Sequence, residues 1–320
     1  MTGKYSHLDW QRILAPLDEL RDCSICPHEC GADRAGTKLG FCQSGVGFSV
    51  ASIFPHKGEE PVISGENGIC NVFFSHCNMQ CVYCQNYEIS RNRETVAQET
   101  QSLEVILDRI LQITDAGIKL VGFVSPSHYI PQMKVLMAVL NEIRPGLRFV
   151  FNNGGYDRVE TIRELEGSVA VYLPDFKYMD ENLARRYSHA PHYPEVAKGV
   201  LKEMFRQKGS NLWLDDDGLA ESGMIIRHLV LPGEAENSKS VLRFIAEELS
   251  PGVHLSLMSQ YWPTPAVAGH PKLGRKVTVE EYDEVLAELH RLGFHRGWVQ
   301  ELESPDHYRP EFSKETPFGE

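Results

Sequence analysis

Cysteine is missing from this 320-residue chain after position 84. No apolar run approaches the ~18 residues that a membrane span requires, and the stretch from Met1 to Gln11 lacks the basic and apolar regions of a signal peptide. These absences argue against a membrane protein and against an exported protein with disulfides spread along its length. We therefore expect a cytoplasmic chain whose thiols are reduced.

Basic residues are fewer than acidic ones: the chain has 32 Lys and Arg and 44 Asp and Glu, which gives a formal net charge of −12. Nucleic-acid binding depends on Lys and Arg that neutralise phosphates, so this balance predicts no nucleic-acid partner. A hydrophobic content of 42% is enough to bury a large core. The composition favours a globular enzyme whose partner is a small molecule or a protein segment.

Short apolar or β-branched runs alternate with helical patterns along the chain, which is typical of a parallel sheet built from βα units. The predicted strands are residues 70–75, 120–124, 148–152, 169–173, 224–231, 253–258 and 297–300. The predicted helices are residues 103–114, 131–143, 157–165, 193–207, 238–248 and 279–292. Six or seven such units predict an α/β fold of the TIM type, a partial (β/α)6 barrel.

Polar side chains follow the predicted strands, at the ends where the chemistry of a parallel barrel gathers. They lie in loops 77–84, 125–128, 152–155, 174–177 and 260–263. This placement predicts an active site at the carboxyl ends of the strands.

Cys77, Cys81 and Cys84 form a cysteine loop (residues 77–84) whose spacing lets one segment wrap an iron-sulfur cluster. A [4Fe-4S] cluster normally takes four cysteines, so three predict one iron that is open to a non-protein ligand. The alternative is a structural zinc site in which Cys70 or His76 supplies the fourth ligand. Zinc ligands more often come as two Cys-x-x-Cys pairs, which favours the cluster.

Four more cysteines form a second constellation in a glycine-rich stretch near the N-terminus, and its members are Cys23, Cys26, Cys30 and Cys42. Zinc and an iron-sulfur cluster use the same four thiolates, and the irregular spacing leaves both open. A protein that is already loaded with iron and sulfur slightly favours a second cluster. We expect a small cysteine-rich metal-binding module at residues 1–62 and a barrel at residues 63–320.

The cysteine loop, with Tyr83 just before its last cysteine, resembles the signature of the radical S-adenosylmethionine (SAM) superfamily. In that family the amino and carboxylate groups of SAM chelate the open iron. The resemblance implies that an electron from the reduced cluster breaks the bond from sulfur to C5′ and that the 5′-deoxyadenosyl radical takes hydrogen from a substrate. It also implies an oxidoreductase that uses a [4Fe-4S] cluster, SAM and an electron donor of flavodoxin or ferredoxin type.

Within the superfamily, the chain resembles the pyruvate formate-lyase activating enzyme-like group from about residue 23 to residue 300. The matching segments are residues 23–30, 56–61, 73–86, 172–180, 227–233 and 257–261. Glycyl-radical activating enzymes hold the ribose and carboxylate of SAM with an Asp-x-Lys element after the fourth strand, and Asp175 and Lys177 occupy that place here. The resemblance implies a glycyl radical protein as partner.

Two loops depart from the pattern of those enzymes. Residues 125–128 replace a Gly-Gly-Glu element that holds the amine of SAM, which leaves Ser127, His128 or backbone carbonyls as acceptors for that amine. A histidine at a helix start is as often a cap or a packing residue. Asn152 and Asn153 replace an Asp-Thr pair and retain hydrogen-bonding groups for the ribose.

Arg227 interrupts an apolar strand, where an unpaired charge is costly. We expect its guanidinium to point into the barrel toward an anion, such as the carboxylate of SAM or a substrate. His56, Glu59 and Glu60 precede the barrel and are candidates for a substrate entrance, although charged loops are usually solvated.

Two enzyme hypotheses therefore compete. The first is an activase that installs a glycyl radical on a partner protein, and the second is a radical SAM enzyme that abstracts hydrogen from a small metabolite or another peptide. The non-enzymatic alternative is a metal-stabilised binding or electron-transfer protein. An electron carrier would ligate its cluster fully and would need no Asp-x-Lys element, which favours the enzymes.

Overall fold

A nine-stranded sheet organises the computed structural model, which describes residues 4–36, 38–92, 100–302, 310–312, 314 and 317–318. The strands are β1 (Val50–His56), β2 (Ile69–Phe74), β3 (Leu120–Val124), β4 (Arg148–Asn153), β5 (Val171–Pro174), β6 (Trp213–Leu214), β7 (Ala220–Leu229), β8 (His254–Met258) and β9 (Gly297–Val299). Their order is β1-β2-β3-β4-β5-β7-β8-β9, with β6 paired to the side of β7. All seven predicted strands are present, whereas β1 and β6 were not predicted.

Seven of the strands run parallel, from β2 through β3, β4, β5, β7 and β8 to β9. Each new parallel strand is added on the same side of the previous one, as in a barrel and unlike a doubly wound sheet whose order reverses. The seven parallel strands agree with the six or seven predicted βα units. Within the described residues the sheet ends at β1, which is antiparallel to β2, and at β9.

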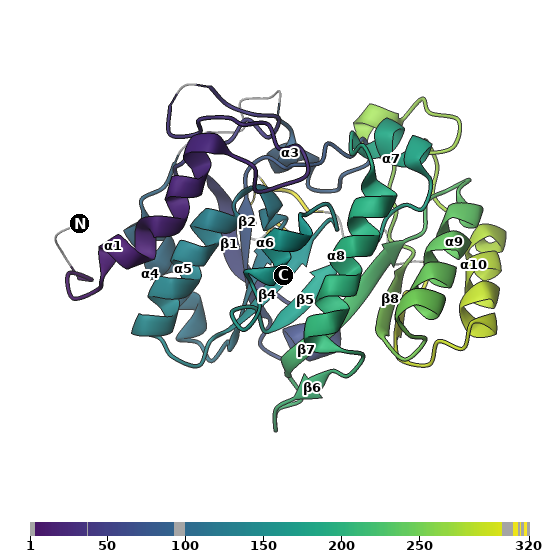
Figure 1. Ribbon diagram of the computed structural model, residues 1–320. Helices are drawn as coiled ribbons and strands as arrows, with labels where there is room; N and C mark the ends of the chain where they lie inside the picture. The colour runs from purple at the N-terminus through teal and green to yellow at the C-terminus, as the bar shows by residue number, and fades with distance from the viewer. Residues whose placement is uncertain are drawn as a thin grey trace.

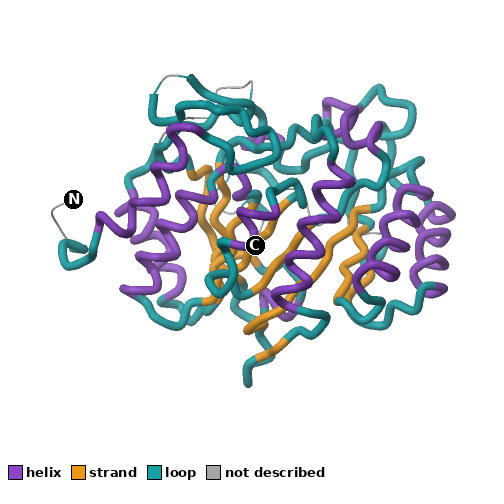
Figure 2. Tube along the Cα trace, in the orientation of Figure 1, coloured by secondary structure: helices purple, strands orange, loops and turns teal. Residues whose placement is uncertain are grey.

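Helices connect and cover the strands, as Figure 2 shows in purple against the orange sheet. They are α1 (Trp10–Leu14), α2 (Pro61–Ser64), α3 (Tyr87–Ser90), α4 (Leu103–Thr114), α5 (Ile130–Ile143), α6 (Val159–Arg163), α7 (Glu181–Ser188), α8 (Tyr193–Lys208), α9 (Ala235–Phe244) and α10 (Val279–Arg291). Short 3-10 turns span Ala15–Asp22, Pro126–His128 and Pro265–Val267, and a π turn spans Ile245–Leu249. Among the described residues, no helix is long and apolar enough to cross a bilayer.

Helix α4 illustrates why these connections form where the pattern predicts them. Ser102 caps its first turn by accepting a hydrogen bond from the Val105 amide, which satisfies one otherwise unpaired donor. Ile106, Leu107 and Ile110 recur at helical spacing and are fully buried in the main core. The opposite face is exposed and mostly polar, with Val105 as an apolar exception, so burial of one stripe fixes the orientation of the helix.

The barrel interior is filled from its floor by apolar side chains that alternate along the strands. Ile69, Leu120, Val150 and Val171 form a separate buried cluster there, and Ile63 of α2 packs into the same cluster. Two residues further along, β2 and β4 place the polar residues Asn71 and Asn152, whereas β5 continues with the apolar Leu173. The floor therefore closes one end of the barrel and leaves its carboxyl end for the site.

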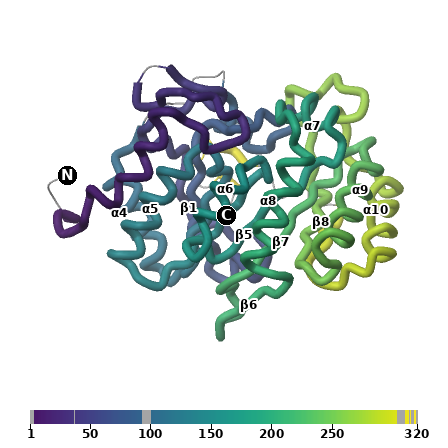
Figure 3. The backbone as a smooth tube through the Cα atoms, viewed as in Figure 1, coloured from purple at the N-terminus to yellow at the C-terminus, as the bar shows by residue number. Residues whose placement is uncertain are grey.

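The N-terminal segment lies at that carboxyl end. Figure 1 shows it in purple at the same end of the sheet as α3 and α7, the short helices that follow the loops after β2 and β5. Figure 3 shows α9 and α10, in green to yellow, on the side of the molecule opposite the purple N-terminal segment. Strand β1 belongs to the sheet although it precedes residue 63, and the boundary between the two expected domains remains a prediction.

Two phenylalanines near the C-terminus pack over the edge strand. Phe312 contacts the Phe73 ring with centroids 5.4 Å apart, and Phe318 lies 6.0 Å from Phe54 and 4.3 Å from His56. These rings cover the side of the barrel where β1 ends the sheet.

Candidate active site

A cavity of about 500 Å³ opens at the carboxyl ends of the strands. It is lined by side chains from the cysteine loop and from every neighbouring strand end. Of the residues predicted for cofactor or metal binding, those on its wall are Cys77, Cys81, Cys84, Tyr83, Ser127, Asn152, Asn153, Asp175, Lys177 and Arg227. The structure therefore brings together ten residues that are up to 150 positions apart in the chain, counting from Cys77 to Arg227.

Each sulfur of the cysteine loop accepts a hydrogen bond. The Met79 amide donates to the Cys77 sulfur over 3.3 Å, the Ser188 hydroxyl to Cys81 over 2.9 Å, and the Ser90 hydroxyl to Cys84 over 3.3 Å. Such donors stabilise thiolate charge and tune the clusters that thiolates hold. The donor pattern fits iron-sulfur ligands, and the two serines were not predicted from the sequence.

Neither residue proposed as a fourth zinc ligand joins the three cysteines on the cavity wall. Cys70 is fully buried in the main core, where burial raises its pKa to about 12. His76 is 2% exposed and adopts a left-handed backbone conformation, with a φ of 67°. Among the described residues, no three His, Cys, Asp or Glu side chains already share the geometry of a single-ion site.

Asp175 and Lys177 form an ion pair on the cavity wall, with Lys177 Nζ 2.5 Å from Asp175 Oδ2. Burial disfavours the charged ammonium, but Asp175 and the Cys81 sulfur outweigh that effect and raise the pKa of Lys177. Lys177 also opposes the burial that raises the pKa of Cys81 to about 11. Lys177 therefore stays protonated and places its positive charge next to the cysteine loop.

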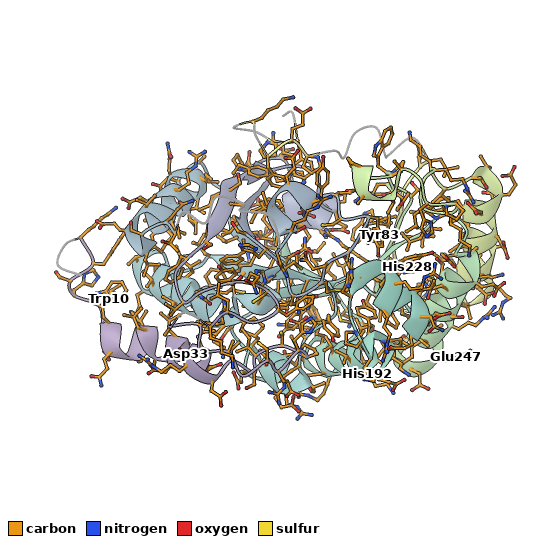
Figure 4. All side chains as sticks on the ribbon, turned by 90° about the horizontal axis from the view of Figure 1, so that it is seen from above. Trp10, Asp33, Tyr83, His192, His228 and Glu247 are labelled. Atoms are coloured by element: carbon orange, nitrogen blue, oxygen red, sulfur yellow. The ribbon has the colours of Figure 1, made fainter. Side chains whose placement is uncertain are left out.

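Three side chains fix the loop that carries this ion pair. Tyr193 Oη accepts from the Lys177 amide over 2.9 Å and lies 2.9 Å from the carbonyl oxygens of Gly154 and Asp175. Asn237 donates to the Lys177 carbonyl over 3.0 Å. His228 lies 2.6 Å from the Phe176 carbonyl. Figure 4 labels His228 together with Tyr83, and both lie well inside the outline of the molecule.

Asn153 is oriented by a buried acid that the sequence did not reveal. Its amide nitrogen donates to Asp157 Oδ2 over 2.5 Å, and Asp157 is 1% exposed. Burial raises the pKa of Asp157 to about 6, while Ser127 and Asn153 act in the opposite direction. The bond fixes which face of the Asn153 amide turns to the cavity.

The turn after β4 lies close to two other loops, and a glycine in this turn makes the close approach possible. A methyl group on Gly154 would lie 2.8 Å from the Met79 sulfur and 3.7 Å from Cε of Lys177. Gly155 follows with a φ of 73°, which favours glycine. The turn after β4 can therefore touch both the cysteine loop and the Asp-x-Lys element.

His128 is the one predicted cofactor residue that the structure does not bring to the cavity wall. Its ring is fully buried, and Nε2 lies 2.8 Å from the Ser75 carbonyl at the end of β2. Burial lowers its pKa to about 3, so the ring stays neutral. His128 packs between strand ends, while Ser125 and Ser127 of the same loop face the cavity.

Arg227 pairs with two carboxylates of the protein itself, Glu59 and Glu60. Its guanidinium donates from Nε to Glu60 over 2.9 Å and from one terminal nitrogen to both Glu60 and Glu59. Glu59 also accepts from Asn71 over 2.8 Å. Burial opposes the charge on Glu59, but Arg227 and His56 outweigh it and lower its pKa. The two carboxylates and one guanidinium leave a net negative charge on this part of the wall.

Tyr83 belongs to a buried chain of hydroxyl groups that ends at a sulfur of the cysteine loop. Its Oη pairs with that of Tyr178, which lies 2.7 Å from the Ser188 hydroxyl. Ser188 in turn donates to Cys81. The aromatic residue of the motif is thereby linked to one of the proposed ligands.

The four N-terminal cysteines also converge. Cys23, Cys30 and Cys42 all lie within electrostatic range of Cys26. Cys23, Cys26 and Cys42 are buried, and Cys30 is exposed. The segment that carries these cysteines contacts the cysteine loop, because His28, between Cys26 and Cys30, places its Nε2 2.8 Å from the Asn78 carbonyl.

Comparison with known families gives a match to the radical SAM superfamily over residues 71–245. An uncharacterized protein of Methanocaldococcus jannaschii is 28% identical over 273 residues, which cover 83% of this chain and 73% of that protein. The family match over residues 71–245 includes the cysteine loop, the Asp-x-Lys element and Arg227.

Solved structures are similar at the level of the fold. Coproporphyrinogen III oxidase from Escherichia coli, described as a radical SAM enzyme, aligns with a TM-score of 0.50 and 13% identity over 70% of this chain and 52% of that chain. A domain of pyruvate-formate lyase-activating enzyme from Bacteroides vulgatus aligns with a TM-score of only 0.38 and 15% identity over 54% of this chain and 93% of that domain. The second similarity is too low to support a shared activity.

Proposed function

The chain belongs to the radical SAM superfamily, and we propose that it holds a [4Fe-4S] cluster at Cys77, Cys81 and Cys84 and cleaves SAM reductively. The observation that carries this proposal is the cavity wall itself. It presents three cysteines, each with a hydrogen-bond donor at its sulfur, beside a buried lysine and aspartate. Three thiolates suit a cluster with one iron left for an external chelator.

The protein side chains would bind and orient SAM. Lys177 is placed to neutralise its carboxylate, and Asp175 to accept from its ribose hydroxyls. Ser127, Asn152 and Asn153 add hydrogen-bonding groups on the neighbouring strand ends. When bound, the cluster would supply the electron that splits SAM to methionine and a 5′-deoxyadenosyl radical.

The substrate we favour is a segment of a partner protein, with glycyl radical installation as the reaction. The motif resemblance to activating enzymes supports this choice. A volume of about 500 Å³ is in the range of single-ligand sites, so SAM leaves room only for a narrow group such as one loop of a partner. We expect the electron to come from a flavodoxin or ferredoxin type donor.

A small metabolite is the second candidate, and the paired charges of Glu59, Glu60 and Arg227 favour it. Convergent charged groups on the wall of a cavity usually recognise the polar part of a small ligand. Deuterium-labelled substrates separate the two candidates, because label should pass from the true substrate into 5′-deoxyadenosine.

Anaerobic reconstitution with iron and sulfide tests the core of the proposal. Wild-type protein should show a [4Fe-4S] absorption band and, with a strong reductant, convert SAM to 5′-deoxyadenosine and methionine. Replacement of Cys77, Cys81 and Cys84 by Ala should lower the iron content by about four irons per chain and abolish SAM cleavage, whereas Cys70→Ala, a change of a buried thiol outside the cavity, should leave both unchanged. Stoichiometric zinc at the three cysteines in protein purified without oxygen would contradict the proposal.

A further inference from the structure

Arg34 is the most unusual residue outside the active site, because it is a cation that is only 2% exposed. Its guanidinium donates to the carbonyls of Ser44, His128 and Gly45 over 2.8, 2.6 and 3.0 Å. No carboxylate among the described residues forms an ion pair with it. Carbonyl groups satisfy the donors but leave the positive charge without a counter-charge.

A buried charge of this kind is costly unless an opposite charge lies nearby. The Tyr129 ring, 5.4 Å from the guanidinium carbon, supplies only a weak cation–π attraction. The other close group is the sulfur of Cys23, 3.8 Å from a terminal nitrogen of Arg34. A neutral thiol would not compensate the charge, whereas a metal-bound thiolate would.

From this geometry we infer that Cys23, Cys26, Cys30 and Cys42 bind one four-thiolate metal centre, and that Arg34 is its counter-charge. Four thiolates around zinc or around an oxidised [4Fe-4S] core leave a net charge of about −2 in either case. A guanidinium beside such a centre is therefore stabilised by it and stabilises it in return. The site lies outside the proposed SAM chemistry and does not depend on it.

The backbone around the cysteines is built for close approach of sulfur. Cys23 pairs with Ala32 in an isolated antiparallel bridge, and its carbonyl accepts from the Gly31 amide over 3.1 Å. At Gly40 a methyl group would lie 2.3 Å from the Cys30 sulfur, so only glycine admits this thiol. Because no three of the side chains already share single-ion geometry within the described residues, metal binding requires them to rotate inward.

The test uses full-length protein that lacks the first site, with Cys77, Cys81 and Cys84 all changed to Ala. One sample is analysed for zinc as purified without oxygen, and a second for iron and sulfide after anaerobic reconstitution. We expect one centre per chain, either about one zinc or about four irons. Adding Cys26→Ala should remove it, and adding Cys70→Ala should not. Absence of bound metal from both samples would overturn the inference.

Arg34 is tested by the rate at which a chelator removes the metal. Arg34→Met should speed release by about tenfold or more, because a charge-assisted contact is lost. Arg34→Lys keeps the charge without the planar fork and should lie between wild type and Arg34→Met. Circular dichroism before the measurement shows whether each variant is folded, and Arg34→Gln is a second variant without the charge that retains the test if the methionine variant is not folded. Equal release rates in a folded variant without the charge and in wild type would refute the counter-charge role.

Discussion

Removing the ammonium of Lys177 should weaken SAM binding without preventing cluster assembly. The side chain is 16% exposed and its partner Asp175 is 25% exposed, so both act from a largely dry wall. A hydrogen bond to a charged group in such a place contributes about 1.5 to 3 kcal/mol. Lys177→Ala and Asp175→Asn should each raise the dissociation constant of SAM by about 10- to 150-fold.

Equilibrium binding of SAM to anaerobically reconstituted protein measures this effect, with iron content determined on the same samples. Lys198→Ala is the matched control, because Lys198 also pairs with an acid three residues away but lies on α8, outside the cavity wall. Iron content should match wild type in all three variants. Wild-type SAM affinity in both cavity variants would show that the Asp-x-Lys element does not bind SAM, and recognition would then rest on Ser127 and Asn153.

Three further predictions concern groups that the structure revealed. Burial raises the pKa of Asp157 to about 6, whereas the pKa of an unfolded Asp is about 3.9. The unfolding free energy should therefore fall by about 2 to 3 kcal/mol as the pH rises from the unfolded value to the folded value. Denaturant titrations at several pH values should show this fall in wild type and not in Asp157→Asn. Ser188→Ala removes the hydroxyl at Cys81 and should lower the cluster potential by on the order of tens of millivolts in an EPR-monitored redox titration, with an unchanged potential contradicting the tuning role. Arg227→Met leaves two buried carboxylates unpaired and should lower the unfolding free energy by about 3 to 5 kcal/mol, and changing both glutamate partners to glutamine should recover most of that loss.

The strands and long helices were predictable because each buries one periodic face. Helix α4 has the predicted bounds, and β3 spans the predicted residues 120–124. Helix α7 was missed, since it is only eight residues long and most of its residues are polar. Strand β1 was missed because Pro55 and two partly exposed positions interrupt its alternation, and its pairing with β2 is what makes it a strand.

Only the residues of the cavity wall that belong to short contiguous motifs were predictable from the sequence. The cysteine loop and Asp-x-Lys element are contiguous in sequence and could be found there. Ser188, by contrast, is 107 residues from Cys81, and Glu60 is 167 residues from Arg227. No periodicity links such positions, so the hydrogen bonds at the sulfurs and the internal partners of Arg227 required the fold.

Because Phe318 lines the cavity, the cavity wall can be completed only late in the synthesis of the chain. The wall is made from residue 56 onward but includes Trp298 and Phe318, so it is complete only when the last of these has left the ribosome. At about 5 to 20 residues per second, the 234 residues between Cys84 and Phe318 take on the order of ten to fifty seconds to synthesise. During that interval the newly made cysteine loop has no closed wall around it, which leaves a period in which iron and sulfide can be delivered to the nascent chain.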